Sequence, residues 1–296
     1  NSFNKFYVYG GYQPTVGNAV TSFDKVEVSH SGDKWTYSPV RYWINGTWKF
    51  EAYSTSAEAD ANVSEASWSY TGGLKFTVNS DNSHQGDLVY GAPTSNNISV
   101  ADATQPQSPV SLKFKHLLSK IQFKFTLDNS VSAYTVKLSD FKVYGMFTNG
   151  NFANATLSVG TTKAEEASAY TGFATEGGEK VEANGLVAGP FYVIPQEVKT
   201  GDEAFAITFN AVVTDGENTL KNGTVTAVVP QGADGAHASW VAQNFYQYSA
   251  TIGLENIKDD ENPDENFQPI VFKVELEPWV NMVDVPAALD KTTQEP

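Results

Sequence analysis

Apolar and polar residues alternate with a period of two along most of the chain. The clearest alternating runs lie at residues 48–53, 74–78, 205–213, 225–229, 246–254 and 270–276. One apolar face opposite one polar face is typical of half-buried antiparallel strands. No segment shows a convincing helical stripe, so the pattern predicts an all-β protein with mainly antiparallel strands.

Two segments change the parity of their apolar positions. Within residues 111–127 these positions are even-numbered up to Leu118 and odd-numbered from Ile121, which places an irregularity at Ser119–Lys120. The same change occurs across Ser139–Asp140. A one-residue shift sends side chains to the opposite face unless a bulge or bend absorbs it. Strands that bend in this way are typical of β-sandwiches.

The chain has 296 residues, enough for two domains of about 150 residues each. Hydrophobic residues make up 41% and aromatic residues 13%, so each half can build a packed core. The richest turn region near the middle is Gly145–Gly160. We therefore expect an N-terminal β-sandwich domain over residues 1–150 and a C-terminal one over residues 151–296.

The formal net charge of -15 argues against nucleic acid and anionic membrane surfaces as partners. The chain has no cysteine, which excludes disulfides and thiolate metal sites, and Arg41 is its only arginine. It contains no apolar run of the roughly 20 residues that span a bilayer. The chain opens inside a predicted strand, so we expect that a presequence has been removed or is not included in the sequence.

No catalytic, nucleotide-binding or metal-binding motif is present, so we expect neither an enzyme nor a cofactor or metal. His116 lies on the apolar face of its strand, where a core histidine with one hydrogen bond is the expected role. An aromatic group suits either core packing, which is favoured, or a sugar-stacking platform: Trp35, Tyr37, Tyr42, Trp43 and Trp48. A carboxylate pair brought together by the fold, as in glycosidases, stays open as a third reading.

An ordered series of short motifs resembles the fimbrillin family of bacterial surface proteins. The motifs are Tyr42–Trp43 with Trp48–Tyr53 (WKFEAY), Gly86–Tyr90 (GDLVY), Leu112–Ile121 (LKFKHLLSKI), Ile194–Gln196 (IPQ), and Trp240–Tyr248 followed by Trp279. The segment 112–121 is the most specific of them. Gly91 stands where alanine is common in the family, and the family's lipidated cysteine is not seen.

This resemblance implies two tandem transthyretin-like β-sandwich domains, export as a lipoprotein, and assembly at the outer membrane surface of Gram-negative anaerobes. It implies subunits that polymerise by strand exchange, as homo- or hetero-polymers, after removal of an N-terminal strand. Processing in the family often uses an arginine. Arg41 lies well inside the first domain, so such a cut falls upstream of Asn1 or does not occur in this member.

The sequence thus predicts a structural or adhesive fimbrial subunit with other subunits, and a host protein or glycan, as partners. The alternative is a cell-surface glycan-binding β-sandwich module, and a β-sandwich enzyme ranks last. The residues expected to form or support a terminal assembly strand are Ile270, Phe272, Val274, Leu276 and Trp279. A domain's last core strand explains them equally well. Asn281–Pro296 is interpreted as a tail or as part of a donor segment.

Overall fold

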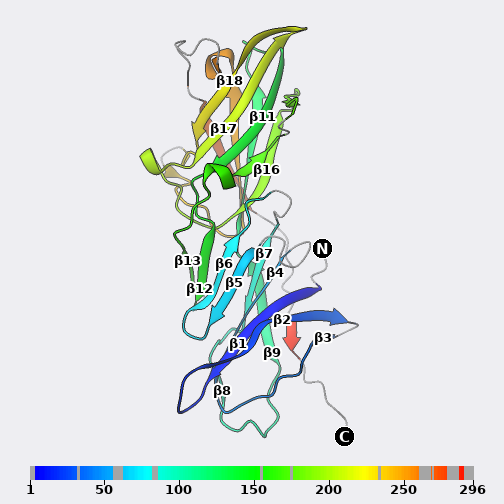
Figure 1. Cartoon of the computed structure of the whole chain (residues 1–296), viewed down its shortest axis with the longest axis vertical. Coiled ribbons are helices and arrows are strands. Elements are labelled where there is room, and N and C mark those ends of the chain that lie inside the picture. Colours follow the sequence, from blue (N-terminus) through cyan, green and yellow to red (C-terminus); the bar gives the residue numbers. More distant parts are fainter. Residues whose placement is uncertain are drawn as a thin grey trace.

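The chain folds into two lobes stacked along one long axis (Figure 1), and nearly all of its regular structure is β-strand. The computed structural model describes residues 4–31, 34–55, 63–81, 86–153, 156–173, 176–232, 235–259, 268, 270–278 and 287–289. All strand pairs but two in these residues are antiparallel. The prediction of a mainly antiparallel all-β protein is confirmed, whereas the transthyretin-like detail stays a prediction.

The N-terminal lobe is built around a ring of seven strands. The pairings run in the order β1-β2-β3-β22-β9-β7-β4, and β4 pairs with β1 to close the ring, while β8 adds to β4. The strands are β1 (Lys5–Gln13), β2 (Val20–Ser31), β3 (Lys34–Tyr37), β4 (Gly46–Thr55), β7 (Leu88–Ala92), β8 (Ile98–Val100), β9 (Val110–His116) and β22 (Ala287–Leu289). Phe6, Trp48, Phe50 and Leu112 belong to one buried cluster shared by these strands.

A second sheet of four strands belongs to the same lobe, in the order β13-β12-β6-β5. Its strands are β5 (Val63–Ser69), β6 (Gly73–Val78), β12 (Asn149–Ala153) and β13 (Thr156–Val159). Tyr9, Tyr53 and Tyr90 from the ring pack with Phe76 and Phe152 from this sheet in a separate buried cluster. The second sheet therefore covers part of the outward face of the ring. The alternating pattern in the sequence assigns that face to solvent.

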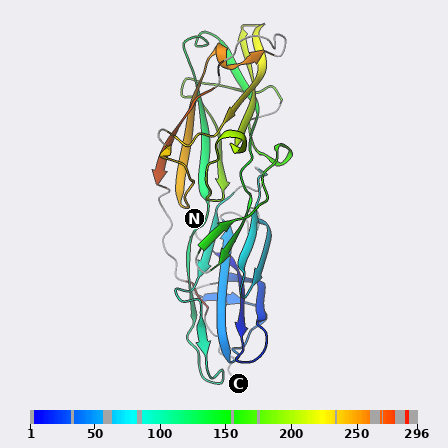
Figure 2. The ribbon, with the colours of Figure 1, turned by 90° about the vertical axis from the view of Figure 1, so that its left-hand side faces the viewer.

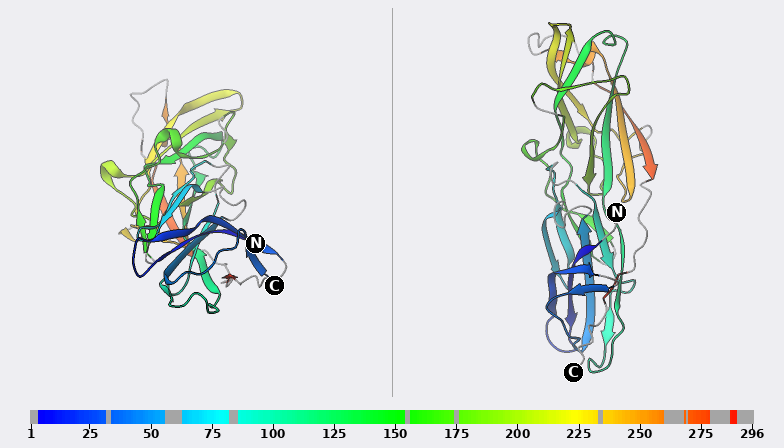
Figure 3. Two further views of the ribbon diagram at one scale, coloured as in Figure 1. Left: turned by 60° about the horizontal axis from the view of Figure 1, so that its bottom comes forward. Right: turned by 90° about the vertical axis from the view of Figure 1, so that its right-hand side faces the viewer.

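The C-terminal lobe is a sandwich of a four-stranded sheet, β16-β10-β19-β21, and a six-stranded sheet (Figures 2 and 3). In the second sheet the order is β14-β11-β17-β18-β20, with β15 paired to β11. The strands are β10 (Ser119–Leu127), β11 (Thr135–Tyr144), β14 (Tyr170–Gly172), β15 (Glu179–Lys180), β16 (Leu186–Val193), β17 (Ala206–Asp215), β18 (Asn218–Val228), β19 (Asn244–Ile252), β20 (Lys258–Asp259) and β21 (Phe272–Pro278).

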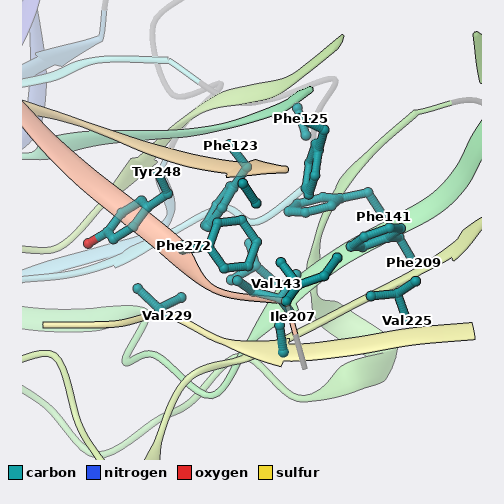
Figure 4. Packing of buried hydrophobic residues seen from close by; sticks show 14 of the residues in the cluster. Phe123, Phe125, Phe141, Val143, Ile207, Phe209, Val225, Val229, Tyr248 and Phe272 are labelled. Carbon is teal, nitrogen blue, oxygen red and sulfur yellow. The ribbon is translucent and has the colours of Figure 1, made fainter. Parts of the chain in front are cut away.

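Aromatic rings from both sheets fill the core of this sandwich (Figure 4). Phe123 stacks on Tyr248 with 5.3 Å between ring centroids, and Phe125 meets Phe209 edge-on at 4.9 Å. Phe272 of β21 lies 5.9 Å from both Phe123 and Phe125. The apolar face of the alternating pattern thus becomes the inner face of each sheet, as expected for sheets packed face to face.

The chain passes between the lobes at short irregular steps. Strand β9 ends at His116 and β10 begins at Ser119, so the break lies at Leu117–Leu118, two residues before the predicted irregularity at Ser119–Lys120. Leu118 packs in the N-terminal lobe and Ile121 in the C-terminal lobe, because the strand changes sheets between them. The chain then returns through β12–β13 to the N-terminal lobe. Whether residues 1–150 and 151–296 fold as separate domains stays a prediction.

The second predicted irregularity is confirmed. The register between β11 and β17 shifts between Ser139 and Lys142, and Asp140 adopts a positive φ of 53°. Asn210 on β17 donates a hydrogen bond to the Asp140 carboxylate at 3.2 Å. The bulge keeps both Leu138 and Phe141 in the core, although their numbers differ in parity.

Candidate assembly site and clefts

The C-terminal segment of the chain completes the ring of the N-terminal lobe. Ala287, Ala288 and Leu289 lie opposite Leu112, Ser111 and Val110 of β9 in antiparallel register. On its other side Leu289 lies opposite Trp35 of β3 in parallel register. We call the space between β3 and β9 the seam. Among the described residues, β22 is the strand that fills it.

The seam has the physical character of a strand-binding groove. An unpaired strand edge presents a row of N–H and C=O groups that pair readily with another strand. Both walls also belong to the core, because Trp35, Val110 and Leu112 are buried in the ring's shared cluster. Without β22, the edges of β3 and β9 that face the seam lose the backbone partner seen here.

The predicted assembly strand lies in the other lobe. Strand β21 pairs with β19 and forms the edge of its sheet, with Tyr248 opposite Val274 and Ala250 opposite Phe272. Ile270 and Phe272 are each only 6% exposed, whereas Leu276 is 45% exposed. The first two are thus core residues, whereas Leu276, on the same face of the strand, is largely exposed to solvent. Trp279 lies outside the described residues, so its expected role stays a prediction.

The structure divides the aromatic group of the possible sugar platform. Trp35 and Trp48 are buried, and Trp48 stacks on Phe50 with 5.6 Å between centroids, as core packing requires. Tyr37, Tyr42 and Trp43 line a cavity of about 270 Å³, together with Arg41 and the inner Trp48. Arg41 is held by Nε and Nη1, which donate to the carbonyls of Ser22 and Pro39 at 3.0 and 3.2 Å. We call this space the aromatic cavity.

A second cleft of about 360 Å³ forms where the β5–β6 hairpin meets strands β4 and β7. At its base lies Glu51, which is only 4% exposed. Trp68 donates from Nε1 to Glu51 Oε2 at 2.8 Å, and the Tyr90 hydroxyl donates to Oε1 at 3.0 Å. We call this space the Glu51 cleft.

Burial is the main cause of the pKa shifts of Glu51 and Tyr90. Loss of solvent raises the pKa of Glu51 to about 7, and the hydrogen bonds from Tyr90 and Trp68 only partly oppose it. Burial, followed by the nearby Glu51 carboxylate, raises the pKa of the Tyr90 phenol far above its usual range. Tyr90 therefore remains a hydrogen-bond donor at any physiological pH, while Glu51 changes charge near neutrality. The sequence placed Glu51 only on a polar face and gave no sign of this environment.

The motifs that resemble the fimbrillin family meet in space. His116 is buried, and its Nδ1 contacts the Asp87 carboxylate, so the predicted core histidine is confirmed. Asp87 and Tyr90 belong to GDLVY, whereas Glu51 belongs to WKFEAY. These conspicuous polar residues of the motifs thus pair with one another across strands β4, β7 and β9.

The later motifs also hold the backbone in place. Gln196 of IPQ is buried; its Oε1 accepts from the Phe147 N–H at 2.8 Å, and its Nε2 donates to the Phe147 carbonyl at 3.0 Å. Trp240 donates from Nε1 to the hydroxyl of Tyr248 at 2.7 Å. In both motifs, therefore, a buried polar side chain has a hydrogen-bond partner, which is the condition for burying such groups.

The described residues contain no group of three or more histidine, cysteine, aspartate or glutamate side chains arranged to hold a metal ion. In the same part of the chain, no helix has the length and apolar character needed to cross a membrane.

Comparison with known proteins agrees with this architecture. The model of the fimbrillin-like family matches residues 3–279. A fimbrial protein from Bacteroides vulgatus is similar in structure, with a TM-score of 0.54, 16% identity, and 93% of each chain covered. A candidate cell adhesion protein from Parabacteroides distasonis gives a TM-score of 0.51 at 12% identity, covering 95% of this chain and 90% of the other. No curated protein sequence matches the chain.

The fold and the family match together define a bacterial surface protein of the pilus-forming class. The chain belongs to the fimbrillin-like family, which matches it over nearly its whole length. It is accordingly a structural or adhesive subunit of a bacterial surface fimbria, exported to the cell surface and assembled with other fimbrial subunits.

Proposed function

We propose that this fimbrial subunit joins its neighbours by β-strand exchange, with β22 of one chain occupying the seam of the next. In this role the protein performs no catalysis. The proposal also places the fimbria at the outer membrane surface, with an N-terminal lipid anchor on the chain and a host protein or glycan as adhesion ligand.

The observation that carries the proposal is the position of β22 in the seam. Three residues of β22 pair with β9, and one of them also pairs with β3. Main-chain pairing of this kind is the same whether the strand comes from the same chain or from a neighbour. Exchange between chains therefore replaces each backbone contact with an equivalent one. The difference in free energy between the closed monomer and the exchanged polymer depends mainly on the segment that links β21 to β22 and on protein concentration.

The connection between lobes is long enough for such an exchange. Strand β21 ends at Pro278 and β22 begins at Ala287, which leaves eight residues, 279–286, between them. Nine peptide steps span at most about 30 Å when fully extended. A segment of this length can leave its own seam and reach an adjacent subunit.

We call the segment that follows β21 and carries β22 the arm. Strand β21 fixes the arm to the C-terminal lobe. Phe272 is fixed among Phe123 and Phe125, and seven residue pairs join β21 to β19. We therefore propose that Ile270 and Phe272 anchor the arm, while Val274, Leu276 and Trp279 lie toward the end from which it departs. In this account the predicted assembly residues support the donor strand rather than form it.

Single-cysteine chains test the exchange directly, because the natural chain has no cysteine. Ser111 on β9 is exposed and lies opposite Ala288. One preparation carries Ser111→Cys and the other Ala288→Cys, and the two are mixed under assembling conditions and oxidised. Strand exchange predicts a disulfide-linked dimer of the two variants on a non-reducing gel, since directly opposed residues lie within disulfide reach.

A matched control uses Thr219→Cys on β18, which is exposed but lies in the other lobe. Mixed with the Ala288→Cys chain, it is expected to cross-link only at the background rate of random collision. Cross-linking of the 111–288 pair at no more than this background rate would contradict the proposal.

A further inference from the structure

The Glu51 cleft has features that a structural role alone does not require. A buried ionisable group is costly unless it is fully paired, and in a cleft it marks a functional site more often than elsewhere. The lining includes Trp68, Tyr70, Lys49 and the loop residues Asn96 and Asn97. Its volume of about 360 Å³ lies at the lower end of the range for small-molecule sites.

Contacts with the backbone and with one another hold several of its lining side chains in place. The Tyr70 hydroxyl donates to the carbonyl of Thr47 at 2.9 Å, and the Lys49 ammonium lies 4.7 Å from the Tyr70 ring centroid. Asn96 accepts from the backbone N–H of Phe50 through Oδ1 at 2.7 Å. A lining that is already fixed loses little conformational entropy when a ligand binds.

The cleft also keeps hydrogen-bonding capacity. An ionised carboxylate accepts about four hydrogen bonds. Trp68 and Tyr90 supply two to Glu51, and the backbone of Leu74 adds a smaller favourable interaction, so at least one position remains. The Asn96 carboxamide oxygen is engaged, and its NH₂ group has no partner among the described residues. Thr94, Ser95 and Asn97 add exposed hydroxyl and amide groups along one rim.

The charges select for a neutral ligand. Glu51 at the base disfavours an anion when ionised, and the Lys49 ammonium on the wall disfavours a cation. A ligand that suits the remaining features has many hydroxyl groups and one apolar face that packs on aromatic rings. Saccharide rings have this combination.

We propose that the Glu51 cleft binds a neutral saccharide, with Trp68 and Tyr70 against the ring and with Asn96, Asn97 and Glu51 contacting its hydroxyls. The inference does not depend on strand exchange, because the cleft is formed by β4, β5, β7 and their loops and the seam by β3 and β9. It also differs from the platform considered from the sequence, whose members other than Trp35 line the aromatic cavity.

The test is saturation-transfer NMR on the full chain with free glucose, galactose, mannose, N-acetylglucosamine, lactose and maltose as probes. At least one sugar is expected to bind saturably. Trp68→Ala is expected to weaken that binding about tenfold through loss of the stacking surface. Asn97→Ala, at an exposed loop position, is expected to weaken it severalfold without affecting folding.

Tyr42→Ala is the matched control, because Tyr42 is 76% exposed and lies in the aromatic cavity. It is expected to leave the affinity unchanged. The proposal is overturned if none of the six sugars binds, or if binding survives both cleft variants. Loss of binding in Tyr42→Ala with the cleft variants intact would also overturn it, because the site would then be the aromatic cavity.

Discussion

Leu289 lies opposite Trp35 in parallel register, in a chain where nearly every other strand pair is antiparallel. The two residues are separated by most of the sequence, yet their pairing closes the ring of the N-terminal lobe. A closed ring has no exposed edge, which is how β proteins avoid unwanted strand pairing. Here the closing strand spans only three residues, so the seam is the place where the ring can be reopened most easily.

A chain that ends at Pro278 lacks β22 and is expected to unfold at a lower temperature, because β3 and β9 lose the backbone pairing that β22 supplies. A synthetic peptide of residues 281–296 is expected to restore part of the loss in proportion to its concentration, since it binds only the folded state. Calorimetry measures both effects. Equal melting temperatures for the full and shortened chains would show that β22 does not stabilise the ring.

Phe272 and Leu276 lie on the same strand but are expected to respond differently to truncation. Phe272→Ala removes a buried ring from contact with Phe123 and Phe125, and is expected to lower the free energy of unfolding by about 3 kcal/mol. Leu276→Ala, at a position that is 45% exposed, is expected to cost less than about 0.5 kcal/mol. Urea titration of both variants checks this contrast. Equal losses would mean that β21 is not an anchored edge strand.

Glu51 is expected to make stability fall as pH rises. Its pKa is raised from 4.5 to about 7 in the folded state, so the folded protein holds this proton more tightly than the unfolded chain. The stabilisation is complete below the unfolded pKa and is lost as pH rises through the folded pKa. Between about pH 4.5 and pH 8 the loss amounts to about 3 kcal/mol at most.

Glu51→Gln is the matched variant for this prediction, because its amide can accept from Trp68 and donate to Tyr90 without a charge. The difference in unfolding free energy between Glu51→Gln and the natural chain is expected to grow in favour of the variant between about pH 5 and pH 8. Parallel pH profiles for the two proteins would contradict the raised pKa.

Gly73 and Gly177 offer a matched pair for backbone packing. Both have positive φ, at +74° and +77°, so alanine strains the backbone at either position by roughly 1 kcal/mol. A Cβ at Gly73 would lie 2.3 Å from the Phe152 carbonyl oxygen, whereas at Gly177 it meets nothing within 4 Å. In thermal unfolding, Gly73→Ala is expected to lower the melting temperature at least twice as much as Gly177→Ala does. Equal costs would show that β6 and β12 do not pack as closely as described.

The alternating pattern predicted the strands well because each strand places one apolar face in a core. The parity change at Ser139–Asp140 even located a bulge, since Leu138 and Phe141 must both remain buried. The irregularity predicted at Ser119–Lys120 lies two residues after the break that the structure shows. There the strand ends and changes lobes at Leu117–Leu118, and a parity change cannot distinguish a bulge from a break.

The candidate site was less accessible to sequence reasoning. Glu51 alternates with Trp48, Phe50 and Ala52, and this pattern assigns it to a solvent-facing side. The β5–β6 hairpin covers that side, and nothing local to β4 reveals a second layer. Strand β22 consists of two alanines and one leucine, too short to show a period. β22 pairs where it does because, in the described part of the chain, β3 and β9 have no other neighbouring strand on the edges that face the seam. Only the folded arrangement of the strands shows this.

The most direct test of strand exchange through the seam is a reversible lock. In the double variant with Ser111→Cys and Ala288→Cys, oxidation joins β22 to β9 within one chain, since these positions are directly opposed. Electron microscopy and size-exclusion chromatography follow assembly of the oxidised and reduced forms, with and without limited trypsin treatment. Strand exchange through the seam predicts filaments or ladders from the reduced protein, monomers from the oxidised protein, and assembly again after reduction. Filaments that form equally well from the locked monomer would contradict it, and so would a reduced protein that remains monomeric throughout.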